Sequence, residues 1–217
     1  MPRSFKNAVA SLAILLAPLG TATNVWSHPH EFVEMKVVVQ FDDQKRVKGF
    51  EYTWLFDEFF SAYAIGPADS DRDGVPEQEG LDNLIVEIMG NIHPLDYFTK
   101  FDTNSLVPEI AQAKPLKASM VGRQLQLNFN VPFKQPVSLS GKSLSYSIYD
   151  DEFYIAMNHS IKPDAVVLAG APEGCKFDLA IPDPDEDVRQ FASSLGKTES
   201  GGPDLGINFA EWVTISC

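Results

Sequence analysis

Long stretches of this chain alternate between apolar and polar residues, and a period of two predicts β-strands with one buried face. The first stretch has an apolar face that consists of Val33, Met35, Val37, Val39 and Phe41. A polar turn follows, and the second stretch has an apolar face that consists of Phe50, Tyr52, Trp54 and Phe56. We therefore expect an opening β-hairpin.

Later stretches with the same alternation predict four more strands, at residues 124–131, 143–148, 175–181 and 213–217. Half-polar strands of this kind are typical of antiparallel sandwiches and not of buried parallel sheets. The predicted fold is therefore mainly β, an antiparallel β-sandwich. The acidic run at 150–152 is interpreted as a hairpin turn, with cation binding by its carboxylates as the alternative.

A helical insertion is expected at about residues 57–103, between the second and third of these strands. Residues 57–64 predict a short amphipathic helix. A firmer helix follows from the i, i+3, i+4, i+7, i+8 spacing of Leu81, Leu84, Ile85, Ile88 and Met89. Pro76 suits the first turn of this helix. We expect the insertion to lay an apolar stripe on the sandwich, and we expect a further short helix at about 188–195.

The N-terminus has the pattern of a secretory signal peptide over residues 1–27. Two basic residues precede an apolar run at 8–17 that is too short to span a bilayer. Cleavage is compatible with two sites, after Ala22 or after Ser27. The second site leaves residues 28–217 as a single domain, and we expect this mature protein in the periplasm.

The chain is acidic. Its formal net charge is −13 at pH 7, and the predicted signal contributes two positive charges, so the mature chain carries −15. Such acidity argues against nucleic acid or an anionic membrane as a partner and is compatible with cation binding. No second apolar run approaches the length of a membrane span, so we expect no membrane insertion of the mature chain. The sequence also lacks a Gly-x-Ser-x-Gly elbow and a glycine-rich phosphate loop, and we do not expect an enzyme.

Two of the four histidines stand at the predicted mature N-terminus, in His28-Pro29-His30. The later cleavage gives His28 a free α-amine beside two imidazoles, a nitrogen-rich set that suits Cu(II), Ni(II), Co(II) or Zn(II). Pro29 has no N–H, so the square-planar chelate that uses deprotonated amides cannot form. We expect a divalent transition metal at these two histidines, completed by a carboxylate or by a third histidine, for which His93 and His159 are open choices. The earlier cleavage would instead leave both histidines on an exposed tail.

The second candidate metal site is an acidic loop with the pattern Asp-x-Asp-x-Asp-Gly, which resembles the opening half of a calcium loop. Its predicted ligands are the side chains of Asp69, Asp71 and Asp73 and the carbonyl of Val75, with Glu79, Glu77 or a water as the closing ligand. The usual closing position is a glycine here, so we expect weaker calcium affinity. The alternative is a solvated acidic turn in which Asp73 caps the following helix.

The two cysteines, Cys175 and Cys217, both belong to the predicted mature chain. For an exported protein the default interpretation is one disulfide, and both residues fall on apolar strand faces, which favours a buried bond. A thiolate metal site is the alternative, although the chain has no Cys-x-x-Cys pair.

Four runs of residues occur in a specific order, at 28–30, 54–61, 69–74 and 149–155. In this order they resemble the bacterial periplasmic family catalogued as domain of unknown function number 1007, over nearly the whole mature chain. Members are labelled as the periplasmic component of an uncharacterised ABC-type transport system and often neighbour nickel or cobalt exporters. The resemblance implies metal handling with a membrane metal transporter as partner. It also implies that His28 and His30 bind the metal at the N-terminal end, and that Asp69, Asp71 and Asp73 form the acidic loop.

The sequence therefore predicts a periplasmic metal-binding accessory protein that passes an ion to a membrane transporter or senses the ion for it. A copper-type metalloenzyme that holds its metal through an N-terminal histidine is one alternative, although the sequence shows no obvious sugar-binding aromatic surface. A calcium-stabilised module for protein–protein contact is the other alternative.

Overall fold

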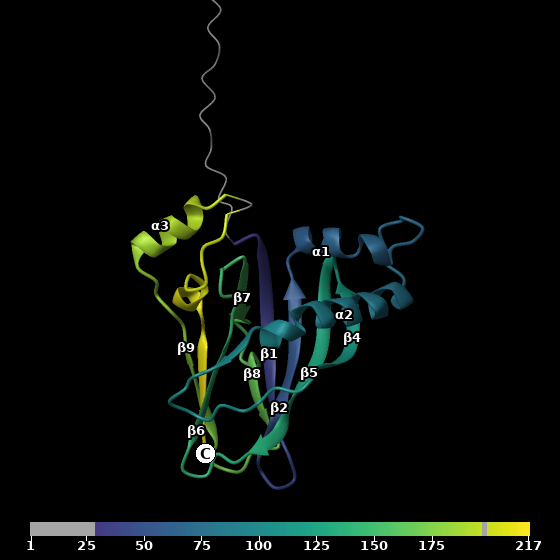
Figure 1. Cartoon of the computed structure of the whole chain (residues 1–217). Coiled ribbons are helices and arrows are strands. Elements are labelled where there is room, and N and C mark those ends of the chain that lie inside the picture. The colour runs from purple at the N-terminus through teal and green to yellow at the C-terminus, as the bar shows by residue number, and fades with distance from the viewer. Residues whose placement is uncertain (1–28, 197–198) are drawn as a thin grey trace, which may run out of the picture.

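The computed structural model describes residues 29–196 and 199–217, and its strands form two sheets that face each other (Figure 1). Sheet A contains β1 (Glu31–Phe41), β2 (Val47–Phe56), β4 (Lys114–Val121), β5 (Gln124–Val137), β7 (Ile155–His159) and β8 (Val166–Ala169). Sheet B contains β3 (Thr99–Phe101), β6 (Ser143–Ile148), β9 (Lys176–Ala180) and β10 (Trp212–Ser216). The predicted fold, mainly β and sandwich-like, is confirmed.

The strand order of sheet A is β4-β5-β2-β1-β7, and β8 also pairs with β1. The order of sheet B is β3-β6-β10-β9. β1 and β2 form the predicted antiparallel hairpin, with Val33 opposite Phe56. Every second residue of β1 from Val33 to Phe41 is buried, because this face of the strand belongs to the main core. Aromatic side chains fill much of that core, for example Trp54 of β2, which lies edge-on to Phe129 of β5.

β7 and β8 run parallel to β1, which the sequence pattern did not predict. β6 belongs to sheet B and β7 to sheet A, so residues 149–154 cross from one sheet to the other. The interpretation of residues 150–152 as a hairpin turn is therefore wrong. Because β7 is parallel to β1, the two strands start at the same end of the sheet, with Glu31 level with Ile155.

The helices are α1 (Glu58–Ala64), α2 (Gln78–Ile92) and α3 (Glu186–Ser194), with short 3₁₀ turns η1 (Gly66–Ala68), η2 (His93–Phe98) and η3 (Gly206–Phe209). The predicted helical insertion is present, and Leu81, Ile85 and Met89 of α2 are buried in the core. The N-cap of α2 is Glu77, so Pro76 lies before the helix and not in its first turn. Within the described residues, no helix has both the length and the apolar character needed to cross a membrane.

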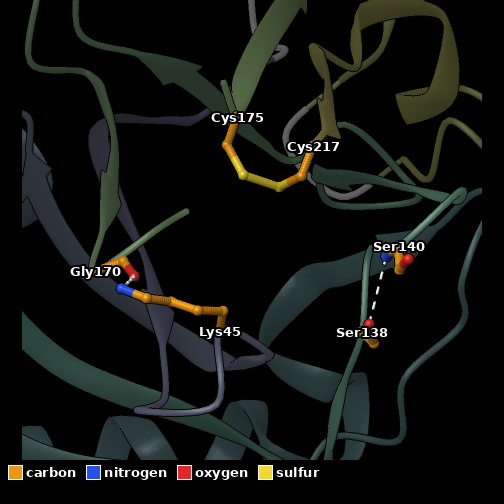
Figure 2. The surroundings of a disulfide bond; sticks show 6 residues. All are labelled: Lys45, Ser138, Ser140, Gly170, Cys175 and Cys217. Carbon is orange, nitrogen blue, oxygen red and sulfur yellow. Dashed lines mark hydrogen bonds between the residues drawn. A yellow bond between two sulfur atoms is a disulfide. The ribbon is translucent and has the colours of Figure 1, made fainter. Parts of the chain in front are cut away.

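Cys175 and Cys217 form a disulfide, at the end of sheet B where Lys176 of β9 pairs with Ser216 of β10 (Figure 2). The predicted bond is confirmed. The predicted burial is wrong, because Cys217 is exposed and Cys175 is only half-buried. Both cysteines lie just beyond the last paired residues, where the opposite sheet no longer covers them.

Removal of this disulfide is expected to lower the free energy of unfolding by roughly 4 kcal/mol, because the bond closes a loop whose ends are 42 residues apart. Thermal unfolding of the unmutated protein and of a variant with both cysteines changed to serine measures the effect. Equal melting temperatures for the two proteins would contradict the prediction.

Candidate metal centre

The start of β1 is held between two segments that lie far away in the sequence. The backbone N–H of His30 donates to the carbonyl of Tyr154 at 2.8 Å, and the two rings lie 4.4 Å apart. On the side of β2, the N–H of Phe32 donates to Oδ2 of Asp57 at 2.9 Å, and the N–H of Asp57 donates to the carbonyl of Phe32 at 3.0 Å. Three of the four sequence runs singled out above therefore meet at this end of β1.

Two aspartates of these runs are positioned by backbone N–H groups. Asp57 is the N-cap of α1, and its Oδ1 accepts hydrogen bonds from two N–H groups of the first helical turn, at 2.8 and 2.9 Å. Oδ2 of Asp150 accepts hydrogen bonds from the N–H groups of Tyr154 at 2.8 Å and Ile155 at 3.2 Å. Main-chain dipoles thus orient both carboxylates, and these contacts do not neutralise their charge.

The chain around Gly206, which follows α3, packs against the backbone of Asp150 and Asp151. The N–H of Gly206 donates to the carbonyl of Asp151 at 2.8 Å. A β-carbon at position 206 would overlap the carbonyl oxygen of Asp150, so the close approach of the two backbones requires glycine here.

Glu31, the residue after His30, is the third carboxylate at this end of β1. Its pKa is raised to about 7, first by partial burial and then by the negative charges of Asp57 and Asp150. The three carboxylates therefore lie within electrostatic reach of one another, and a divalent cation would relieve their repulsion. The imidazole of His30 belongs to the preceding residue, and successive side chains of an extended strand point to opposite sides. Among the described residues, the group of His, Cys, Asp and Glu side chains close enough together to share an ion is the aspartate triad of the acidic loop, and not this set.

The sequence did not single out Glu31 or Asp57, because acidic residues occur throughout this chain, and it offered Asp150 as a cation ligand only beside its interpretation as part of a turn. The available signal was positional, since Asp57 and Asp150 belong to two of the runs that carry the family resemblance. His28 and both cleavage sites lie outside the residues that the structure describes, so the role of His28 stays a prediction.

His93 has a structural role at the end of α2. The hydroxyl of Tyr97 accepts a hydrogen bond from the N–H of Ala113 at 2.8 Å and lies 2.9 Å from Nδ1 of His93. Because a hydroxyl has one proton, it can donate that proton to His93. In the part of the chain that the structure covers, no cluster of potential metal ligands includes His93.

His159 is also separated from the start of β1. It pairs with Met35, four residues beyond the pairing of Glu31 with Ile155, which is a displacement of roughly 13 Å along the strand. Its side chain is 1% exposed, and its Nδ1 lies 2.8 Å from Oε2 of Glu211. The structure therefore brings neither His93 nor His159 to His30 as a third nitrogen.

The acidic loop lies between η1 and α2. One carboxylate oxygen from each of Asp69, Asp71 and Asp73 lies within 4.8 Å of the others, as the calcium pattern predicts. Among the described residues this cluster includes neither Glu79 nor Glu77, and the Glu77 carboxylate instead accepts two hydrogen bonds from Ser70. Oδ1 of Asp73 accepts a hydrogen bond from the N–H of Val75, and α2 has no side-chain cap. The alternative in which Asp73 caps the helix is therefore wrong, whereas the Val75 carbonyl stays a prediction.

If the three aspartates hold calcium, Asp71→Ala should lower the melting temperature when calcium is present and leave it unchanged in a chelator. Ligand binding stabilises the folded state by roughly 2.7 kcal/mol at a hundredfold excess over the dissociation constant. Glu87→Ala, an exposed carboxylate on α2, is the matched control and should keep the full calcium response. An unmutated protein that melts at the same temperature with calcium and with chelator would rule out the site.

The fold defines a class, namely a β-sandwich protein with a helical insertion. The profile of the family described as "Protein of unknown function (DUF1007)" matches residues 12–217. An uncharacterized protein of Haemophilus influenzae (strain ATCC 51907 / DSM 11121 / KW20 / Rd) is 31% identical over 206 residues, which cover 94% of this chain and 97% of that protein. The chain belongs to the DUF1007 family, as its sequence runs predicted, and neither description names an activity.

Proposed function

We propose that this protein is a periplasmic accessory protein that binds a divalent transition metal at the start of β1. In this role it passes the ion to a membrane metal transporter or senses the ion for it. The observation that carries the proposal is found at one end of sheet A, where the His30 backbone lies beside Tyr154 and the carboxylates of Glu31, Asp57 and Asp150 lie within electrostatic reach of one another.

The chemistry of this donor set favours a transition metal over a purely oxygen-bound ion. His30, with the imidazole and α-amine of His28 in the mature chain, supplies the nitrogen ligands that Cu(II), Ni(II), Co(II) and Zn(II) prefer. The carboxylates supply negative charge, which compensates the charge of the ion. The acidic chain and the disulfide are in keeping with an exported, cation-binding protein.

An exposed aromatic pair beside the centre supports a protein partner. Phe59 and Tyr63 lie one turn apart on α1, directly after Asp57, and they are 83% and 81% exposed. Large aromatic side chains are enriched where proteins bind each other. A transporter that docked on α1 would be within reach of the metal.

The proposal predicts that the exported protein starts at His28 and is isolated with a stoichiometric transition metal. Intact mass spectrometry and elemental analysis of the protein purified from the periplasm measure both properties. A mature chain that starts at Thr23 would remove the amine from the site. Such a chain, isolated without any transition metal under metal-replete growth, would contradict the proposal.

A further inference from the structure

The solvent-facing side of sheet B contains a groove that takes no part in the metal centre. Its lining on β6 is Ser145, which is small and buried. Ser147, on the same face of β6, is fully buried and donates to the carbonyl of Glu211. Lys100 of β3 and Trp212 of β10 both pair with Ser147, so they stand in one row on its two sides. Two strand spacings separate their backbones by about 10 Å. In the next row, Thr214 stands beside Ser145.

The groove has a volume of about 710 Å³, which is within the usual range for small-ligand sites. Tyr149 extends β6 two residues beyond Ser147 and closes one end of the groove, and Thr103 and Ile207 also line it. The wall around Trp212 and Tyr149 is therefore aromatic, while the other end presents threonine hydroxyl groups.

Lys100 is the cationic residue of this row, and an ion pair already neutralises its charge. Nζ of Lys100 forms an ion pair with Asp151 at 2.8 Å and lies 5.8 Å from the centre of the Tyr149 ring. A site for an anion would instead leave the ammonium group open to the ligand. The other charged residue of the lining is Asp102, whose Oδ1 accepts hydrogen bonds from Asn104. A neutralised cation beside a carboxylate disfavours an anion and fits a neutral ligand that carries hydrogen-bond donors.

We propose that this groove binds a neutral oligosaccharide. Sugar rings combine apolar C–H faces with rims of hydroxyl groups. The rings of Trp212 and Tyr149 match the apolar faces, and the hydroxyls of Thr103 and Thr214 can donate and accept hydrogen bonds at the rims. These residues come from three separate parts of the chain, so the sequence alone showed no such surface.

Titration of the mature protein with maltotriose, cellotriose and chitotriose tests this site. In a chain that starts at His28 the tryptophans are Trp54, which is 2% exposed, and Trp212. Binding of at least one trisaccharide should therefore change the tryptophan emission through Trp212. In calorimetry, Trp212→Ala and Tyr149→Ala should each weaken affinity roughly tenfold, the effect of losing one stacked ring. Trp212→Phe should retain most of the affinity.

Tyr63→Ala, which removes an exposed aromatic ring on α1, is the matched control and should bind like the unmutated protein. The titration is repeated in chelator, where sugar affinity should be unchanged because the groove is separate from the metal centre. Absence of both heat and emission change with all three trisaccharides would overturn the proposal. Binding that Trp212→Ala leaves intact would overturn it as well.

Discussion

His30→Ala is expected to lower the affinity of the mature protein for its transition metal by at least about tenfold, and His28→Ala should do the same. Each substitution removes a ligand and also the chelate that holds the remaining ligands in place. Affinity should also fall as the pH drops below the histidine range, since amine and imidazole must lose their protons before they bind. Calorimetry with Cu(II), Ni(II), Co(II) and Zn(II) measures these effects.

Three further variants separate the components of the centre. One residue added before His28 leaves both imidazoles in place and tests the amine alone. Glu31→Gln removes the carboxylate beside His30 without a change in size, and it should weaken binding. His93→Gln is the control histidine and should bind normally. If the double variant of His28 and His30 binds all four ions as tightly as the unmutated protein, the centre does not exist.

Glu211→Ala is expected to lower the free energy of unfolding by about 3 kcal/mol or more, because it breaks a buried pair and leaves its partner groups unsatisfied. The Glu211 side chain is 7% exposed. Its Oε2 accepts hydrogen bonds from the backbone N–H of His159 at 2.6 Å and lies 2.8 Å from Nδ1 of that residue, while Nδ2 of Asn158 donates to its Oε1 at 3.3 Å. Asn158 and His159 belong to sheet A and Glu211 adjoins β10, so the pair links the two sheets.

The same contacts predict the pH dependence of stability. Burial raises the pKa of Glu211, but hydrogen bonds and charge from His159 outweigh burial, and the net pKa is lowered. A lowered folded-state pKa gives stability that is present above the unfolded-state pKa and is lost as the pH falls through the folded-state value. Glu211→Gln should therefore lose less stability than the unmutated protein on acidification.

Urea unfolding across this acidic range measures the effect of Glu211. Asp178→Ala, an exposed acid on β9, is the matched control and should change stability by no more than about 0.5 kcal/mol. A Glu211→Ala variant as stable as the unmutated protein at neutral pH would show that the pair does not hold the sheets together.

The features that the sequence predicted correctly are those with a strong periodic pattern. The opening hairpin and α2 both have an unbroken apolar face, and both were found. β7 and β8 were missed because strands of five and four residues are too short for a period to stand out, and their parallel pairing depends on the crossover from sheet B.

The sequence indicated only some of the residues of the candidate centre. His30 stood out because histidine is rare in this chain, whereas Glu31 is one of 30 acidic residues. What distinguishes Glu31 is its position near Asp57 and Asp150, and this proximity is a property of tertiary structure. The sequence did not reveal the row of Lys100, Ser147 and Trp212 for the same reason, because these residues belong to three strands that are far apart in the chain.

The contact between Gly206 and Asp150 limits how this family can diverge. Any side chain larger than hydrogen at position 206 would displace the backbone of Asp150, and with it the Asp150 carboxylate. The clash is with a backbone carbonyl, so it arises whatever residue stands at position 150. Relatives that keep this close approach of the two backbones are therefore expected to keep glycine at position 206.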